Sequence, residues 1–166
     1  PRSLPYDKVL SIFEDSHRQI WLTTQGGGFC KFHPETETFT SYDSRNGLPN
    51  DVVYQIVEDK EGLMWLTTNN GLVSFQPATG AMKVYTTANG LLGEQFNYRS
   101  SFETEDGTIY LGSIDGFVAF NPKNFSENKS LPSIVITDFL LFGKEVYPGD
   151  PSSPLKKSIN FLDELV

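Results

Sequence analysis

One strand-rich segment occurs three times along this chain, and it constrains the fold more than any other feature. The copies span residues 12–34 (IFEDSHRQIWLTTQGGGFCKFHP), 56–77 (IVEDKEGLMWLTTNNGLVSFQP) and 102–122 (FETEDGTIYLGSIDGFVAFNP). Trp21, Trp65 and Tyr110 hold equivalent places, about 44 residues apart. Apolar residues do not recur three and four positions apart, as they would in helical repeats. Short strands with a period of roughly 40–45 residues predict the blades of a β-propeller.

Turn residues mark the ends of the strands within each copy. Asp15 and Asp59 open the first turn, where a carboxylate can accept hydrogen bonds from nearby backbone amides. Gly62 and Gly107 can supply a positive φ in that turn, whereas the first copy has Arg18, which predicts a strained or differently shaped turn. The repeat is completed by the glycines of the second turn and by the phenylalanines that end the third strand: Gly28, Gly71, Gly116, Phe32, Phe75 and Phe120.

The innermost and outermost strands can also be predicted from the repeat. Ile12 and Ile56 occupy one apolar position in the first two copies, which predicts an innermost strand buried on both faces. Residues 38–42 and 81–85 are expected to form the outermost strands, and the third copy has no equivalent segment. Trp21 and Trp65, which repeat identically, are expected to be core residues.

The repeats divide the chain into about three four-stranded blades. Their predicted boundaries are 1–43, 44–87 and 88–122, and a polar linker, 123–133, follows them. Residues 134–166 regain a strand-like composition and are read as the start of a second β-domain that is truncated. We therefore expect an all-β fragment: a partial β-propeller of about three four-stranded blades, followed by the first strand or strands of another domain.

Composition excludes several classes of function. The formal charge is −8, with 13 Lys and Arg against 21 Asp and Glu, so we expect no nucleic-acid partner, which would call for clustered basic residues. The single cysteine, Cys30, excludes an internal disulfide and is expected to be a buried thiol. No apolar run approaches the roughly 20 residues of a membrane span.

The pattern GLPxDxVxxIxEDxxGxxWLTTxxGLxxFxP at residues 47–77 resembles the two-component regulator propeller repeat. Residues 96–122 resemble the last blade of such proteins, and the segment from Pro132 resembles the entry into the immunoglobulin-like β-sandwich that follows it. The resemblance implies a periplasmic sensor of a hybrid two-component system that binds a glycan-derived oligosaccharide and signals to a histidine kinase. The kinase and the transmembrane helix are missing from this sequence, so membrane attachment would run through the missing helix alone.

Candidate ligand-binding residues are those on the loops between blades, which converge on one face of a propeller. Amide, guanidinium, carboxylate and phenol groups suit sugar hydroxyls and the faces of sugar rings. The alternative is that these polar loops are simply solvated, and Asn46-Gly47 also suits a turn. The candidates are Arg45, Asn46, Asn50, Asp51, Glu94, Gln95, Asn97, Tyr98 and Arg99.

We predict no catalytic residue, no cofactor and no metal site. Glu58-Asp59 recurs as Glu14-Asp15, and recurrence within a repeat is better explained by folding than by catalysis, which needs one special place. His17 and His33 have polar counterparts in the other copies. Two alternatives stay open, namely a propeller scaffold for protein–protein interaction and, less favoured, a propeller lyase or hydrolase. The latter would need a histidine or carboxylate cluster on the converging loops.

The number of blades has a physical consequence. Propellers close with four to eight blades, so three blades would leave two sheet faces uncovered. Each face would expose more contiguous apolar surface than monomers usually carry. We therefore expect self-association through the open faces or a partner chain that covers them, and two fragments that complete one ring are one such arrangement.

Overall fold

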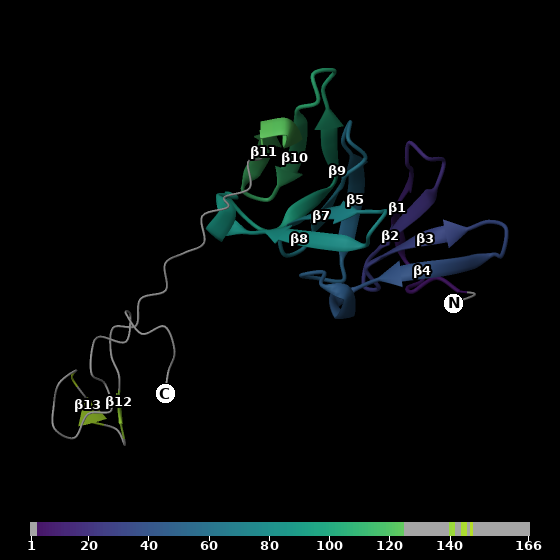
Figure 1. Ribbon diagram of the computed structural model, residues 1–166. Coiled ribbons are helices and arrows are strands. Elements are labelled where there is room, and N and C mark those ends of the chain that lie inside the picture. Colours follow the sequence, from purple (N-terminus) through teal and green to yellow (C-terminus); the bar gives the residue numbers. More distant parts are fainter. Residues whose placement is uncertain (1–2, 125–139, 142–143, 146, 148–166) are drawn as a thin grey trace. The chain divides into compact units, whose positions relative to one another are not determined.

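The computed structural model (Figure 1) describes residues 3–124, 140–141, 144–145 and 147. The chain divides into two units, Pro1–Ser126 and Glu127–Val166. Most of the linker and second domain expected at 123–133 and 134–166 lies outside the described residues, so the domain boundaries stay a prediction. Within the second unit, the two-residue strands β12 (Leu140–Leu141) and β13 (Lys144–Glu145) pair antiparallel.

The first unit consists of three antiparallel sheets in which each strand pairs with its neighbours in sequence. The first sheet contains β1 (Val9–Glu14), β2 (Ile20–Thr24), β3 (Phe29–His33) and β4 (Thr38–Tyr42). The second contains β5 (Val53–Glu58), β6 (Met64–Thr68), β7 (Leu72–Gln76) and β8 (Ala81–Tyr85). The third contains β9 (Phe96–Glu103), β10 (Ile109–Ser113) and β11 (Gly116–Phe120). The expectation of an all-β partial propeller is confirmed, and the third sheet has three strands among the described residues.

Short 3-10 helices accompany the connections that leave each sheet. They are η1 (Ser44–Asn46), η2 (Thr87–Asn89) and η3 (Pro122–Asn124). Residues 3–124 contain no α-helix. The outermost strands β4 and β8 occupy the segments expected from the sequence, because Pro34 and Pro77 end the preceding strands and short turns reverse the chain.

The hydrophobic core lies between the sheets rather than within one of them. The first layer joins Trp21 and Phe29 of the first sheet to a face of the second sheet that includes Ile56 and Phe75. Trp21 and Phe75 meet edge to face with their ring centroids 5.6 Å apart. The second layer packs the opposite face of the second sheet against the third: Tyr54, Val57, Trp65 and Leu72 against Phe96, Ile109 and Leu111. Strand β5 is therefore buried on both faces, as its sequence predicts.

The same prediction is wrong for β1. Ile12 is 69% exposed, whereas Ile56 at the equivalent position is buried. Strand β5 has a sheet on each side, but among residues 3–124 no element lies against the outer face of β1. An apolar residue in a strand shows that its face can be buried, but the face is buried only where a neighbouring sheet lies against it.

Each tryptophan of the repeat is held by the aspartate that opens the preceding turn. One carboxylate oxygen of Asp59 accepts the backbone N–H groups of Glu61 and Leu63, both at 3.0 Å, and the other accepts the indole Nε1–H of Trp65 at 2.9 Å. The first sheet has the same arrangement around Asp15. One buried side chain thus closes a turn and satisfies the only polar atom of a buried indole.

The third copy changes both partners together. Thr104 stands at the aspartate position, where its hydroxyl accepts the backbone N–H of Thr108 at 3.1 Å. Tyr110 stands at the tryptophan position and is partly exposed. A threonine oxygen suffices to close the turn when no indole N–H has to be satisfied. The paired substitution indicates that aspartate and tryptophan act as one unit in this repeat.

The turn at Arg18 adopts the same left-handed conformation as its glycine counterparts. Arg18 has φ +62°, against +79° at Gly62 and +86° at Gly107. Its backbone N–H donates to the carbonyl of Asp15 at 2.9 Å, as that of Gly62 does to Asp59. Of the two outcomes expected from the sequence, the strained turn is the one observed, since a side chain in this region is disfavoured.

We expect Arg18→Gly to raise the free energy of unfolding by about 0.5–1 kcal/mol, because relief of the left-handed strain exceeds the added entropy of an unfolded glycine. The exposed contact of Arg18 with Glu14, at 3.5 Å, contributes little. Urea unfolding followed by circular dichroism measures the change. Arg18→Ala is the matched control, because it removes the same ion pair but keeps the strain. Equal stability of the two variants would contradict the interpretation.

Candidate functional site

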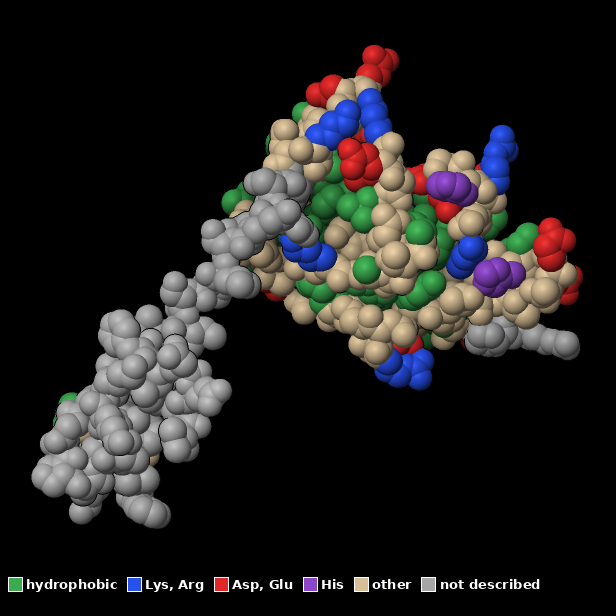
Figure 2. All heavy atoms as spheres, in the orientation of Figure 1, with side chains coloured by type: hydrophobic (Ala, Val, Ile, Leu, Met, Phe, Trp, Pro, Cys, Tyr) green, Lys and Arg blue, Asp and Glu red, His purple; other side chains and the backbone are tan. Residues whose placement is uncertain are grey.

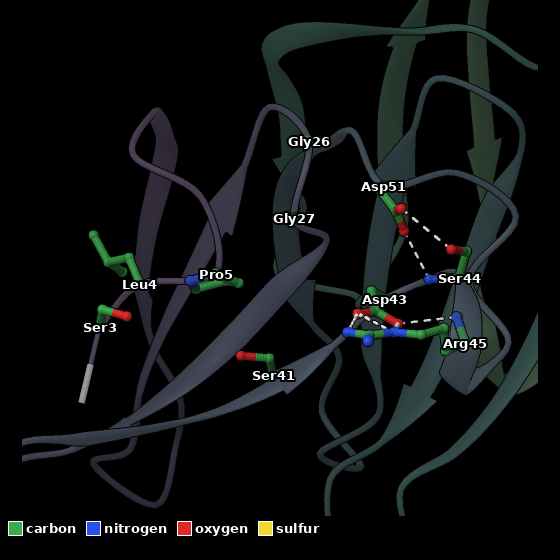
Figure 3. Close-up of a pocket in the computed structure, with 10 residues that line it drawn as sticks. All are labelled: Ser3, Leu4, Pro5, Gly26, Gly27, Ser41, Asp43, Ser44, Arg45 and Asp51. Carbon is green, nitrogen blue, oxygen red and sulfur yellow. Dashed lines mark hydrogen bonds and ion pairs between the residues drawn. The ribbon is translucent and has the colours of Figure 1, made fainter. Parts of the chain in front are cut away.

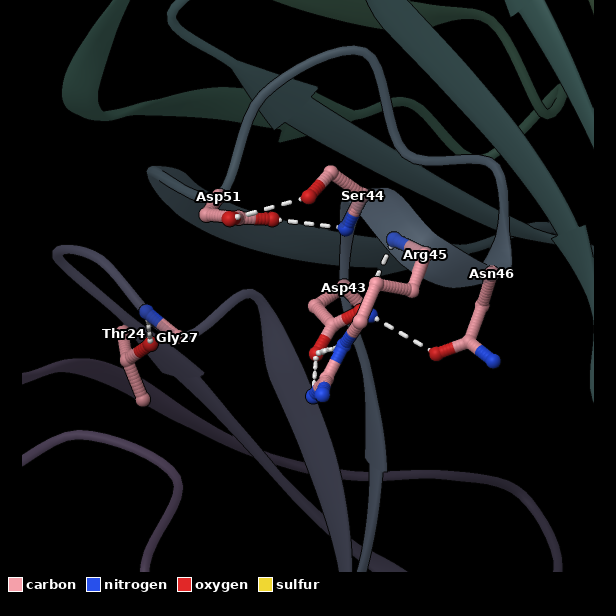
Figure 4. A network of polar contacts seen from close by, with 7 residues as sticks. All are labelled: Thr24, Gly27, Asp43, Ser44, Arg45, Asn46 and Asp51. Atoms are coloured by element: carbon pink, nitrogen blue, oxygen red, sulfur yellow. Dashed lines mark hydrogen bonds and ion pairs between the residues drawn. The ribbon is translucent and has the colours of Figure 1, made fainter.

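The two connections between sheets are built in the same way, around a 3-10 helix with a side-chain cap. In the first, the side-chain oxygen of Asn46 accepts the backbone N–H of Asp43 at 3.1 Å (Figure 4). In the second, Asn89 accepts the backbone N–H of Thr86 at 3.0 Å. Each helix ends in a glycine with left-handed backbone, Gly47 in the first loop. Asn46 is thus bound into its own loop, which agrees with the turn alternative.

A carboxylate closes each connection. Asp51 accepts the backbone N–H of Ser44 at 2.7 Å and its hydroxyl at 3.2 Å (Figure 4). Glu94 accepts the backbone N–H of Thr87 at 3.0 Å and its hydroxyl at 2.9 Å. The two candidates Asp51 and Glu94 therefore have the same role in their loops: each accepts the backbone N–H and the hydroxyl of the first residue of a 3-10 helix.

Backbone hydrogen bonds tie these loops to the second turns of the repeat. The N–H of Gly28 donates to the carbonyl of Asp51 at 2.8 Å, and that of Gly71 donates to Glu94 at 2.6 Å. The loops therefore lie at the same end of the strands as the glycine turns. Each loop is hydrogen-bonded to the second turn of the preceding sheet, and these bonds explain why the loops lie at one end of the strands.

A polar hollow of ≈ 570 Å³ opens at this end of the first sheet (Figure 3). Carboxylate, hydroxyl and guanidinium groups stand around it beside exposed backbone, a mixture suited to a ligand with many hydroxyls. The Ser41 Oγ at its edge is buried without a hydrogen-bond partner among the described residues. The hollow is lined by Ser3, Leu4, Pro5, Gly26, Gly27, Ser41, Asp43, Ser44, Arg45 and Asp51.

Arg45 provides the positive charge of this hollow. Its Nε donates to both carboxylate oxygens of Asp43, at 3.1 and 3.0 Å, and its Nη2 lies 2.5 Å from Oδ2. The hydrogen bonds from Arg45 lower the pKa of the Asp43 carboxyl below its ordinary value. The side chain of Arg45 is largely exposed, so its remaining N–H groups are open to solvent. The pair presents donors and acceptors side by side, in an orientation fixed by η1.

The nine candidates do not meet in one place. Arg45 and Asp51 line the hollow, whereas Arg99 lines a second hollow, on the outer face of the third sheet. Asn97 donates to the carbonyl of Ser113 at 2.8 Å. Asn50 accepts the backbone N–H of Val52 within its own loop, whereas the carbonyl of Gln95 accepts that of Ile114 in the turn between β10 and β11. Asn97, Tyr98 and Arg99 lie in strand β9 rather than on the loop where they were expected, and the ring of Tyr98 contacts that of Tyr54 in β5. Their roles in binding stay a prediction.

Sequence reasoning missed the glycines of the hollow. The first copy carries an additional residue in Gly26-Gly27-Gly28 relative to the other repeats, and departure from the repeat was the criterion applied to the loops. A Cβ on Gly27 would lie 2.8 Å from the carbonyl oxygen of Pro5, and one on Gly26 would touch the ring of Tyr6. The glycines therefore let the N-terminal segment lie directly on the turn, and this contact could not be read from the repeat.

Stability should depend on pH through the loop carboxylates. Hydrogen bonds from Arg45 lower the pKa of Asp43, and those from Thr87 lower the pKa of Glu94. Because the folded pKa lies below the unfolded one, this stabilisation is complete above the ordinary values of 3.8 and 4.5 and is lost as pH falls through the folded values. We expect the Tm to be nearly constant down to about pH 5 and to fall below about pH 4. Glu94→Gln should weaken this dependence, and an unchanged acid limb would contradict the assignment.

Three further properties concern the residues that the structure describes. Within them, no group of three or more His, Cys, Asp and Glu side chains could hold a metal ion. No helix in the same part of the chain is long and apolar enough to cross a membrane. Cys30 is a buried free thiol, and burial raises its pKa to about 11.

The comparison with known protein families matches one copy of the repeat. The family model described as "Two component regulator propeller" matches residues 47–70, which begin at the glycine after η1 and cover β5, β6 and the turns around them. This segment therefore matches a two-component regulator propeller repeat. The strands of the first sheet and the described strands of the third sheet pair in the same order as those of the second. The recognition of the family from the sequence is confirmed.

The chain is similar to part of a much longer protein. It is 34% identical over 154 residues to "Histidine kinase P4" of Formosa agariphila, a match that covers 92% of this chain and 11% of that protein. Solved structures share the fold. The extracellular domain of the putative one component system BT4673 from B. thetaiotaomicron has a TM-score of 0.58 at 24% identity, covering 74% of this chain and 18% of that one. That of the putative hybrid two component system BT3049 has a TM-score of 0.51 at 21% identity, covering 89% and 27%.

Proposed function

We propose that this chain is part of the periplasmic sensor of a hybrid two-component system, where it receives a glycan-derived oligosaccharide without transforming it. Support for the sensor role comes from the regulator propeller repeat at residues 47–70 and from the similarity to a histidine kinase. The sensor would report to a kinase on the other side of the membrane. The chain covers about a tenth of its curated relative, so the role of the whole protein belongs to this proposal.

The observation that carries the choice of ligand is the polar hollow beside η1. It combines a cationic donor, Arg45, with carboxylates and hydroxyls, and the Arg45–Asp43 pair presents its groups in fixed positions. Sugars bind through many hydroxyl groups that both donate and accept. The hollow is partly open to solvent, which suits one end of a chain of sugars rather than a small molecule enclosed on all sides.

A titration of the chain with a panel of oligosaccharides, followed by two-dimensional NMR, tests the proposal. We expect one class of oligosaccharide to shift the amide signals of Gly26, Gly27 and Ser44. Arg45→Ala should raise the Kd about tenfold, as loss of a charged hydrogen bond of 1.4 kcal/mol would. Arg18→Ala, an arginine in the turn at the other end of the strands, is the control and should leave the Kd unchanged. Absence of any shift across the panel would overturn the assignment of the ligand.

A further inference from the structure

A second hollow, of ≈ 350 Å³, lies between the first and second sheets. This inter-sheet hollow is bounded by the turns that contain Asp15 and Glu61, by Lys31 of β3 and by Gln76 at the end of β7. Figure 2 shows histidines and side chains of both charges gathered over the first sheet. Both walls of the hollow are sheets that the structure describes completely. The hollow lies at the end of the strands opposite the polar hollow beside η1.

The equivalent place between the second and third sheets is filled. It measures only ≈ 10 Å³, because the side chain of Lys60 crosses it to the backbone carbonyl of Glu105 and Lys123 lines it from the third sheet. A Cβ added to Gly107 would lie 3.5 Å from two side-chain carbons of Lys60. A Cβ added to the equivalent Gly62 would meet a single carboxylate oxygen, at 3.8 Å.

Short side chains replace both lysines at the inter-sheet hollow. Ser16 stands at the position of Lys60, and Ala78 stands at that of Lys123. Ser16 does not cross the space but donates its backbone N–H and its hydroxyl to Glu58, both at 2.7 Å. The hollow therefore exists because two side chains that fill its counterpart are missing from it.

Polar side chains are added to the hollow at two other positions of the repeat. Lys31 pairs with Trp21 across the strands, at the position where Ser74 pairs with Trp65. Gln19 stands at the position of Leu63. Lys31 and Gln19 both line the hollow. The repeat thus departs from its pattern twice at one place, since the filling is removed and hydrogen-bonding groups are added.

Two of the carboxylates at this place are already occupied. Asp15 accepts the backbone N–H groups of His17 and Gln19, at 2.9 and 2.8 Å, and the indole N–H of Trp21 at 2.8 Å. Glu58 accepts both donors of its partner in the first turn. Neither carboxylate is therefore free to bind a cation.

The remaining charges of the hollow balance each other. The ammonium of Lys31 lies 5.8 Å from the centre of the Trp21 ring and forms no ion pair among the described residues. The side chain of Glu61 is exposed at the rim. With His17 counted as neutral, one cation stands against one anion, and this balance favours a ligand without net charge.

We propose that the inter-sheet hollow binds a neutral, hydroxyl-rich ligand of the size of one sugar ring. Hydroxyl groups donate and accept, and so match the ammonium of Lys31, the carboxylate of Glu61 and the side-chain amides of Gln19 and Gln76. The volume is at the lower end of the range of small-molecule pockets, about 300–1,000 Å³. The proposal does not rest on the oligosaccharide proposed above, because the two hollows lie at opposite ends of the strands.

The two tryptophans give a readout with an internal control. The indole N–H of Trp21 donates to Asp15, which lines the hollow, and that of Trp65 donates to Asp59, which lines the filled counterpart. Two-dimensional NMR of the 166-residue chain follows both indole signals during titration with D-glucose, D-galactose or D-xylose. We expect at least one of these neutral sugars to shift the Trp21 signal and to leave the Trp65 signal in place.

Titration with D-glucuronate tests the charge of the ligand. This anion should shift the Trp21 signal less than the neutral sugars do. Absence of a Trp21 shift with all three neutral sugars, or a shift with D-glucuronate alone, would overturn the proposal. Signals of Ser44, at the other end of the strands, distinguish binding at the hollow beside η1.

Substitutions that copy the filled counterpart locate the binding. Ala78→Lys restores the missing lysine at an exposed position and should raise the Kd of the sugar more than tenfold while the thermal melt by circular dichroism is kept. Ala81→Lys, the same change at an exposed position of β8, is the matched control and should leave the Kd unchanged. Lys31→Met keeps the apolar stem on Trp21 but removes the ammonium, and should raise the Kd about tenfold. Equal effects of the two alanine substitutions would show that the sugar does not bind in this hollow.

Discussion

Asp59→Ala should lower the free energy of unfolding by about 3–4 kcal/mol, among the largest effects of any single substitution in this chain. The substitution removes two hydrogen bonds to the turn amides of Glu61 and Leu63 and leaves the indole N–H of Trp65 buried without an acceptor. Trp65 lies in the layer between the second and third sheets. The loss should therefore loosen the interface as well as the turn. Chemical denaturation monitored by tryptophan fluorescence measures it.

Two control substitutions test the two roles of the Asp59 carboxylate, which are closing the turn and accepting the indole N–H of Trp65. Asp59→Asn keeps one acceptor oxygen but places a donor beside either the amides or the indole, and should cost about half as much. Asp106→Ala, an exposed aspartate in the corresponding turn of the third sheet, should change stability by less than 1 kcal/mol. If Asp59→Ala proved no more harmful than Asp106→Ala, the aspartate–tryptophan unit would not be a source of stability.

Gly28→Ala is expected to lower the free energy of unfolding by about 3 kcal/mol, or to prevent folding of the first sheet. Its φ is +71°, and an added Cβ would lie 2.0 Å from the carbonyl oxygen of Tyr42. Both atoms are fixed by the backbone, so the strand β4 or the turn must move. The movement would also disturb the bond from Gly28 to Asp51 that holds the first loop against the turn.

Gly47→Ala isolates the conformational part of this effect. Gly47 also has a positive φ, +106°, but an added Cβ would have no atom within 4 Å. It should cost only about 1–2 kcal/mol, from backbone strain alone. Thermal unfolding of the two variants side by side measures the difference. Similar losses would show that the close approach of β4 to the turn is unimportant.

The aspartate–tryptophan unit and the glycine turns explain why so much of this fold can be predicted from its sequence. Strands such as Ile20–Thr24 and Ala81–Tyr85 were expected where they occur, because prolines and turn glycines delimit them locally. The repeat period in addition predicted which strands belong to which sheet. The recurrence of Asp and Trp marked both as structural, but their hydrogen bond to each other could not be inferred from spacing alone.

The site was predictable only in part. Polar loops were expected at one end of the sheets, and the hollow lies there, with Arg45 and Asp51 among its lining residues. Glycines and a segment near the N-terminus complete it, because Gly27 packs against Pro5. Such a contact joins residues from different parts of the chain. It leaves no mark in the repeat, since a repeat records only what all copies share.

The sequence by itself determined the local structure. The strands, their turns, the all-β class and the alternation of apolar residues all depend on residues only a few positions apart in the chain. The tertiary structure decided which of those apolar faces are covered. Ile12 and Ile56 have the same side chain in equivalent strands, yet one is exposed and the other buried. Burial depends on a second surface being present, and that is a property of the assembled sheets rather than of any residue.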